Sequence, residues 1–180
     1  RVLAHYLARW DGGRYAKVLL HGDIHQENAD KIGVSRKLVK TISYAFLYGA
    51  GDQKLGISYD KQLSPEKAKK KGKEIRKAYI DAIPGLEKLL EGVHKASARG
   101  YVQAIDKRRI LVDSKHKSLN YLIQGSSAVL AKRWMVLTHE NLPPTARQLA
   151  FVHDELQFEC EKKDVEDLKF LLELSAVQAG

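Results

Sequence analysis

Four side chains recur at intervals of four residues in the segment SRKLVKTISYAFLYGAG. They are Arg36, Lys40, Tyr44 and Tyr48, and Gly49 follows the last of them. Residues four apart lie one turn apart on the same face of an α-helix. The spacing therefore predicts a helix from Arg36 to Tyr48 that carries two cations and then two aromatic rings along one face.

The charges at the start of this helix oppose the helix dipole. Ser35 is a typical N-cap residue. Arg36, Lys37 and Lys40 follow it in the first turns, where the dipole favours negative charge. A polyphosphate at this end would neutralise the cations and accept hydrogen bonds from free backbone N–H groups, leaving Tyr44 to meet a sugar or base. The alternative is a basic amphipathic helix with its tyrosines in a core, and the spacing alone leaves both open.

Apolar residues recur with a helical period along most of the chain and alternate in a few short runs. Asp23, with Gln26 three residues later, indicates a capping box. The predicted fold class is α+β, helix-rich, with antiparallel hairpins. Helices are predicted at 2–10, 15–20, 23–31, 36–48, 65–82, from Gly85 to 98, 118–140 and 163–176, and strands at 101–105, 109–112, 148–152 and 156–160.

Two connections carry specific expectations. The stretch 52–64 is the best candidate for a flexible joint. Asp106 and Lys107 lie between two predicted strands, where a tight turn often needs a positive φ that suits glycine better than lysine. Either this turn differs from the common type or Lys107 carries strain.

The composition limits the classes of function. Lys and Arg outnumber Asp and Glu by 31 to 22, which gives a net charge of +9 and favours a polyanionic partner. The single cysteine, Cys160, excludes an internal disulfide and fits a reducing cytoplasm. No apolar stretch approaches the roughly 20 residues of a membrane span, and the first residues do not form a signal peptide.

The last predicted hairpin places two acids at its tip, in the sequence V-H-D-E-L at 152–156. Carboxylate oxygens are ligands that divalent cations prefer, so Asp154 is a candidate metal ligand. Aspartate is equally common in turns that bind nothing. Glu155 would point away from Asp154 in regular strand geometry, so we expect a supporting role for it.

Four motifs in this order resemble the family A DNA polymerases, the class of bacterial DNA polymerase I and the related phage replicative enzymes. They are D-I-H at 23–25, R-x3-K-x3-Y-x3-Y-G at 36–49, N-x3-Q at Asn120 and Gln124, and V-H-D-E-L at 152–156. The resemblance implies DNA-directed DNA polymerase activity in DNA replication. It also implies one incomplete polymerase domain, with palm-side helices at 1–22, fingers helices at 23–100, and a hairpin, a helix and the palm metal-site hairpin at 101–180.

The resemblance also implies a role for each motif residue. His25, Arg36, Lys40 and Tyr44 would bind a deoxynucleoside triphosphate, and Lys40 could protonate the leaving group. The residues implied to contact primer–template DNA are Tyr48 and Gly49 at the templating base, Asn120 and Gln124 in the minor groove, and His153 at the primer end. Asp154 would bind metal and take part in catalysis with support from Glu155, and the intact enzyme would use two Mg²⁺ ions.

One family motif is present only in its last residue. The first metal-binding motif, roughly D-x-S-x2-E-L-R, is represented here by Arg1 alone. We therefore expect an interior fragment that binds nucleotide and DNA weakly and catalyses little by itself, with any processivity partner bound outside this chain. The alternative functions are a non-catalytic nucleic-acid-binding remnant and a metal-dependent nuclease, and no second carboxylate cluster supports the nuclease.

Overall fold

The computed structural model describes residues 1–152 and 155–180, and the chain divides into two compact units, Arg1–Gln124 and Gly125–Gly180. The helix-rich α+β class is confirmed, because helices alternate with two separate two-stranded antiparallel sheets in the described residues. None of the helices in these residues has both the length and the hydrophobicity of a transmembrane span.

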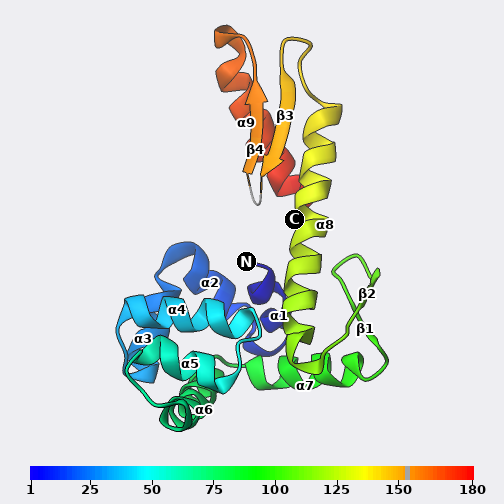
Figure 1. Cartoon of the computed structure of the whole chain (residues 1–180). Helices are drawn as coiled ribbons and strands as arrows, with labels where there is room; N and C mark the ends of the chain where they lie inside the picture. Colours follow the sequence, from blue (N-terminus) through cyan, green and yellow to red (C-terminus); the bar gives the residue numbers. More distant parts are fainter. Residues whose placement is uncertain (153–154) are drawn as a thin grey trace. The chain divides into compact units, whose positions relative to one another are not determined.

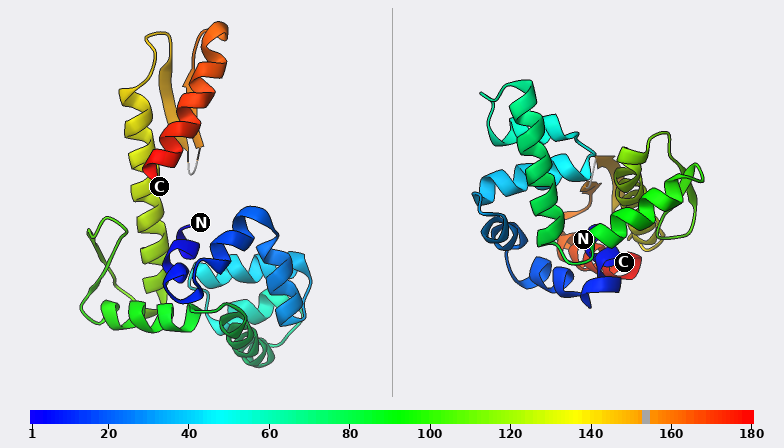
Figure 2. Two further views of the ribbon diagram at one scale, coloured as in Figure 1. Left: turned by 180° about the vertical axis from the view of Figure 1, so that it is seen from behind. Right: turned by 90° about the horizontal axis from the view of Figure 1, so that it is seen from below.

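The first unit is built mainly from helices. Its elements are α1 (Val2–Asp11), α2 (Arg14–His21), α3 (Ile24–Ile32), α4 (Arg36–Leu47), α5 (Asp52–Tyr59), α6 (Pro65–Ala82), α7 (Leu86–Ser97), β1 (Tyr101–Gln103), β2 (Arg109–Leu111), the 3-10 helix η1 (Lys115–Lys117) and the start of α8 (Ser118–Glu140). Helices α2 to α6 gather at one end of the unit, and the β1–β2 hairpin lies at the other, beyond α7 (Figures 1 and 2).

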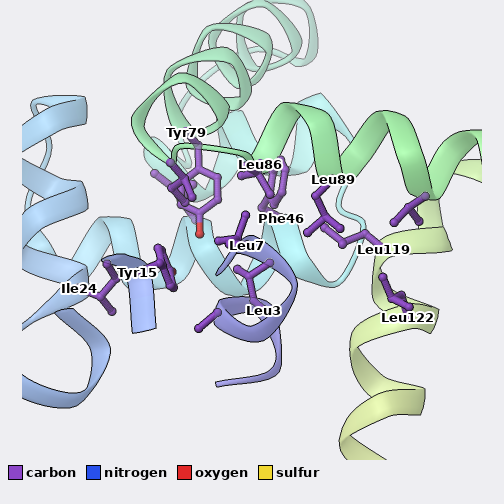
Figure 3. Close-up of a cluster of buried hydrophobic side chains, with 14 of the residues drawn as sticks. Leu3, Leu7, Tyr15, Ile24, Phe46, Tyr79, Leu86, Leu89, Leu119 and Leu122 are labelled. Carbon is purple, nitrogen blue, oxygen red and sulfur yellow. The ribbon is translucent and has the colours of Figure 1, made fainter. Parts of the chain in front are cut away.

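One hydrophobic core joins these helices. Its buried members include Leu7 of α1, Phe46 of α4, Tyr79 of α6, Leu86 of α7 and Leu119 of α8 (Figure 3). The rings of Phe46 and Tyr79 have centroids 4.9 Å apart. Because α4 contributes Phe46 to this core, its opposite face is left toward solvent.

Most of the stretch 52–64 is a packed helix, which corrects the expectation of a flexible joint over its whole length. Its first part forms α5, and α5 packs closely on α6. A β-carbon on Gly56 of α5 would lie 1.8 Å from the carbonyl oxygen of Ala68. The two helices therefore touch backbone to backbone, and Arg76 closes the contact by donating to Asp52 Oδ1 (2.6 Å) and to the carbonyl of Ala50 (2.5 Å).

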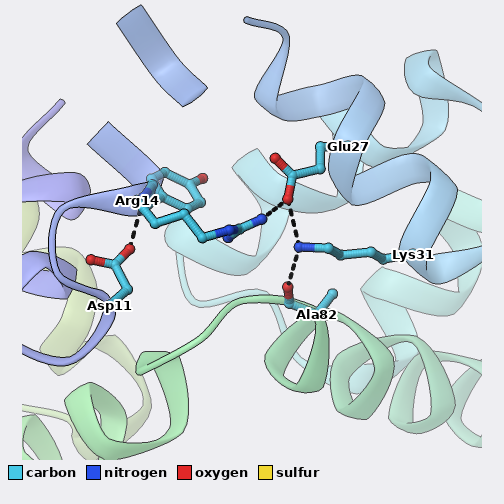
Figure 4. A network of polar contacts seen from close by, with 6 residues as sticks. Asp11, Arg14, Glu27, Lys31 and Ala82 are labelled. Atoms are coloured by element: carbon cyan, nitrogen blue, oxygen red, sulfur yellow. Dashed lines mark hydrogen bonds and ion pairs between the residues drawn. The ribbon is translucent and has the colours of Figure 1, made fainter. Parts of the chain in front are cut away.

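A polar network joins α2, α3 and α6 at the surface (Figure 4). Glu27 of α3 forms ion pairs with Arg14 of α2 and with Lys31, whose Nζ lies 2.6 Å from Glu27 Oε1. The same Nζ also donates to the carbonyl of Ala82 at the end of α6 (3.3 Å). Partial burial and the charge of Arg14 lower the pKa of Lys31. One carboxylate thus compensates two neighbouring cations.

The β1–β2 hairpin turns through Asp106 and Lys107, as predicted. Lys107 has φ 69°, in the left-handed region, and its N–H donates to the carbonyl of Ala104 (2.8 Å). Asp106 stabilises the turn by accepting from the backbone N–H of Arg108 at 3.2 Å and from its Nε at 2.6 Å. Of the two alternatives, the strained lysine is the one that the structure shows, because Lys107 lies in the left-handed region.

The second unit contains the rest of α8, strands β3 (Arg147–Val152) and β4 (Glu155–Glu159), the 3-10 helix η2 (Lys162–Asp164) and α9 (Val165–Ala179). The strands pair antiparallel, with Val152 opposite Glu155 and an irregularity between Gln148 and Ala150. Trp134 of α8 donates from Nε1 to the carbonyl of Leu172 in α9 (3.0 Å). The predicted hairpin and final helix are therefore confirmed.

Candidate nucleotide site

The spaced side chains of α4 form an exposed stripe. The helix begins at Arg36, and Ser35 caps it by accepting from the N–H of Leu38 (3.2 Å). Arg36 and Lys40 are exposed, as are Tyr44 (50%) and Tyr48 (61%). The two tyrosines therefore do not lie in the core, so the alternative interpretation, a basic amphipathic helix with buried tyrosines, is wrong for these two residues.

His25 of α3 lies beside this stripe. Its ring centroid is 6.5 Å from that of Tyr44. Partial burial, with the positive charges of Arg36 and Lys40 nearby, lowers the pKa of His25, while the carboxylate of Asp23 offsets part of this effect. His25 Nδ1 is buried and has no hydrogen-bond partner among the described residues. A neutral imidazole that leaves this nitrogen unprotonated fits these surroundings best.

The structure thus brings together the residues predicted to bind nucleotide. His25, Arg36, Lys40 and Tyr44 lie on adjacent faces of α3 and α4, which also pack against each other. The positive charges of Arg36 and Lys40, beside the half-exposed ring of Tyr44, suit an anionic ligand with an attached sugar or base.

Asp23 also belongs to this cluster, although the sequence indicated no role for it beyond the helix cap and its place in the D-I-H motif. Its Oδ1 accepts from the N–H groups of His25 (3.0 Å) and Gln26 (3.1 Å). Its Oδ2 accepts from Arg36 Nε at 2.6 Å, and this bond is the main reason that the pKa of Asp23 lies below its ordinary value. The predicted capping box is only half formed, because the Gln26 side chain donates to Asp30 (2.7 Å).

The far end of the stripe reaches the start of α8. Gly49 has φ 73°, and its N–H donates to the carbonyl of Phe46 (3.0 Å). A β-carbon on Gly49 would lie 3.1 Å from the carbonyl oxygen of His116 in η1, which leads directly into α8. Any other residue would meet both an unfavourable backbone angle and this contact.

A cavity of about 400 Å³ lies beside Gly49. Phe46, Arg76, His94 and Leu119 are among its lining residues, so it opens between α4, α6, α7 and α8. Asn120 and Gln124 follow one turn apart on α8, as their spacing predicted, and Gln124 is exposed. All these residues belong to the first unit.

Two predicted residues, His153 and Asp154, lie outside the described residues. Glu155 begins β4, is exposed and accepts from Gln157 Nε2 (3.0 Å). In residues 1–152 and 155–180, no three His, Cys, Asp or Glu side chains cluster as a metal site would require.

Comparisons with known proteins match nearly the whole length of this chain. Residues 1–178 match the model of the family described as DNA polymerase family A. The chain is 32% identical over 190 residues to the DNA-directed DNA polymerase of Escherichia phage T7, covering 92% of this chain and 26% of that protein. It is 33% identical over 177 residues to the DNA-directed DNA polymerase of Escherichia phage Phieco32, covering 92% of this chain and 28% of that one.

A solved structure has the same fold. It is the POL domain of Pol1 from M. smegmatis in complex with DNA primer–template and dNTP, with a TM-score of 0.80 and 24% identity over 99% of this chain and 35% of that one. This chain therefore spans about a quarter of the length of the phage relatives it matches.

Proposed function

This chain belongs to the family A DNA polymerases, and we propose that it forms the part of such an enzyme that binds the incoming deoxynucleoside triphosphate. The observation that carries the proposal is the convergence of His25, Arg36, Lys40 and Tyr44 on one exposed face of α3 and α4. In the proposed reaction, a primer 3′ hydroxyl attacks the α-phosphate of a template-paired nucleotide and pyrophosphate leaves.

The cations of α4 have a defined part in this reaction. Phosphoryl transfer is accelerated chiefly by stabilising the negative charge on the phosphate oxygens and the leaving group. Arg36 and Lys40 stand one turn apart at the helix start, where backbone N–H groups add to their effect. We propose that both bind the β- and γ-phosphates, that Lys40 can also protonate the leaving pyrophosphate, and that His25 donates a hydrogen bond to the triphosphate.

The remaining residues are assigned to the sugar, the DNA and the metal. Tyr44 would pack on the sugar, and Tyr48 with Gly49 would contact the templating base. Asn120 and Gln124 would donate to minor-groove acceptors that all correct base pairs share, and His153 would approach the primer end. Asp154, with Glu155 in support, would supply a carboxylate for Mg²⁺. The proposed partner is primer–template DNA, and any processivity partner would bind outside this chain. The proposed location is a reducing cytoplasm, which is that of the host if a phage encodes the chain.

Direct binding of dATP to the purified chain tests the nucleotide site. Arg36→Ala and Lys40→Ala should each weaken binding about tenfold, because each removes a charge-assisted contact to phosphate. Lys37→Ala is the matched control, since Lys37 carries the same charge on the same helix but lies off the stripe. Equal effects of all three substitutions would indicate only a diffuse positive field and would contradict the site.

Primer extension separates polymerase from non-catalytic DNA binding. We expect the chain, expressed together with the sequence that flanks it in its gene, to extend a primer on a template. Asp154→Ala should abolish extension and leave DNA binding in place. Binding without extension would instead identify a non-catalytic nucleic-acid-binding protein, and cleavage of DNA without nucleotide would identify a nuclease.

A further inference from the structure

The carboxylate of Asp23 bonds to two helices at once. Oδ1 accepts from the backbone N–H groups of His25 and Gln26 at the start of α3, and Oδ2 accepts from Arg36 Nε at the start of α4. The two oxygens therefore serve different helices, Oδ1 at α3 and Oδ2 at α4. Because His25 and Arg36 are both proposed phosphate ligands, one side chain links the two segments that carry them.

The bond to Asp23 leaves the two Nη groups of Arg36 available to bind phosphate. The guanidinium has five N–H donors, and Asp23 takes the one on Nε. The Nη groups have no ion pair or hydrogen bond among the described residues, and they form the fork that matches phosphate oxygens. The bond to Nε restricts the orientation of the plane, so less rotamer freedom remains to be lost when a phosphate binds.

We propose that Asp23 is a positioning residue for the triphosphate, which acts by holding the Arg36 guanidinium in its phosphate-binding orientation. This inference rests on the proposed function. The negative charge of Asp23 also repels a triphosphate, but both side chains are about half exposed (44% for Asp23 and 50% for Arg36), so solvent and salt screen that repulsion. The short bond from Arg36 to Asp23 is directional and less sensitive to screening. Its favourable effect on triphosphate binding therefore exceeds the screened repulsion.

Asp23→Asn isolates this bond from the helix cap. Asparagine caps helices about as well as aspartate does. It has a single acceptor oxygen, however, and cannot serve both the α3 N–H groups and Arg36. We expect the affinity for dATP, measured by isothermal titration calorimetry, to fall about three- to tenfold at about 0.5 M salt, with little change in the thermal midpoint. Asp30→Asn is the control, because Asp30 is an exposed acid on the same helix that bonds only to Gln26.

A double-mutant cycle tests whether Asp23 acts through Arg36. In an Arg36→Ala background, Asp23→Asn should change the affinity by less than about twofold, because the bond that it removes is already absent. A general structural role would persist in that background. Asp23→Ser provides a second variant that keeps a capping oxygen but is too short to reach Arg36, and it should behave like Asp23→Asn.

The outcomes separate this inference from the function on which it rests. Tighter dATP binding by Asp23→Asn at high salt would mean that Asp23 is a competitor for Arg36 and would overturn the inference. An unchanged affinity, or a loss that persists without Arg36, would overturn it as well. If Arg36→Ala itself leaves dATP binding unchanged, the proposed nucleotide site fails, whatever Asp23 does.

Discussion

Gly72 of α6 lies directly against Asp52 of α5, so closely that a β-carbon on Gly72 would stand 1.6 Å from the Asp52 carbonyl oxygen. Backbone atoms cannot yield as a flexible side chain does. Gly72→Ala should therefore separate α5 from α6 and lower the free energy of unfolding by about 3 kcal/mol. Urea unfolding followed by circular dichroism measures this loss.

Gly92 of α7 supplies the matched control. It is also a helical glycine, but a β-carbon there would meet nothing within 4 Å. Gly92→Ala should raise the free energy of unfolding by about 0.5–1 kcal/mol, because alanine loses less backbone entropy in a helix. Similar destabilisation by both substitutions would show that the α5–α6 contact is not the cause.

Removing the charge of Glu27 should destabilise the surface network. Glu27→Gln would leave Arg14 and Lys31 as uncompensated neighbours, and we expect a loss of about 1 kcal/mol at low salt. The loss should shrink as salt screens the repulsion. Glu91→Gln, an exposed acid without an ion pair among the described residues, is the control. A loss of stability in Glu27→Gln that stays the same at all salt concentrations would contradict an electrostatic origin.

Lys107→Gly should stabilise the β1–β2 hairpin. The left-handed angle of Lys107 (φ 69°) is strained for a residue with a β-carbon and ordinary for glycine. Relief of this strain outweighs the greater freedom of glycine in the unfolded chain, for a net gain of up to about 1 kcal/mol. Differential scanning calorimetry measures the change, and Lys107→Asn should give part of it. A lower midpoint for the glycine variant would mean that the turn carries no strain.

The protonation of His25 should depend on nucleotide. Burial and the charges of Arg36 and Lys40 lower its pKa from the ordinary value of 6.5, so His25 is neutral at pH 7. A bound triphosphate offsets the two cations and should raise this pKa. Binding then takes up a proton at pH values between the free and the bound pKa, so affinity should increase as pH falls through that interval and should level off below the free pKa.

NMR titration of the histidine ring protons measures this shift, with His25→Gln to assign the resonance. Arg36→Ala should raise the pKa of His25 in the free chain, because it removes a nearby cation and frees the Asp23 carboxylate. A pKa that is unaffected by dATP would show that the phosphates do not reach His25.

Local patterns predicted the features that depend on neighbours in sequence. The period of four in α4 was sufficient because each side chain of the stripe is positioned by the helix itself. Ser35 caps α4 and Pro65 is the first residue of α6, so both predicted helix starts agree with the structure. The turn at Asp106 and Lys107 was also predicted, and strain at Lys107 was one of the two alternatives left open.

Features that depend on tertiary contact were not predicted. Helix α5 contains Gly56 and has no strong apolar face, so its sequence resembles a linker. It is helical because Gly56 and Gly72 allow two backbones to meet, a contact that overrides weak intrinsic propensity. The bond from Arg36 to Asp23 spans 13 residues and depends on how α3 turns into α4, which no periodicity describes.

The cations at the start of α4 oppose the helix dipole, and Asp23 compensates only Arg36, because Lys40 has no ion pair among the described residues. Evolution or engineering for heat resistance alone would therefore tend to replace Lys40 with an acid and so weaken the site. Selection in the presence of nucleotide would retain Lys40, since a bound anion then stabilises the protein through the same charge that destabilises it when empty.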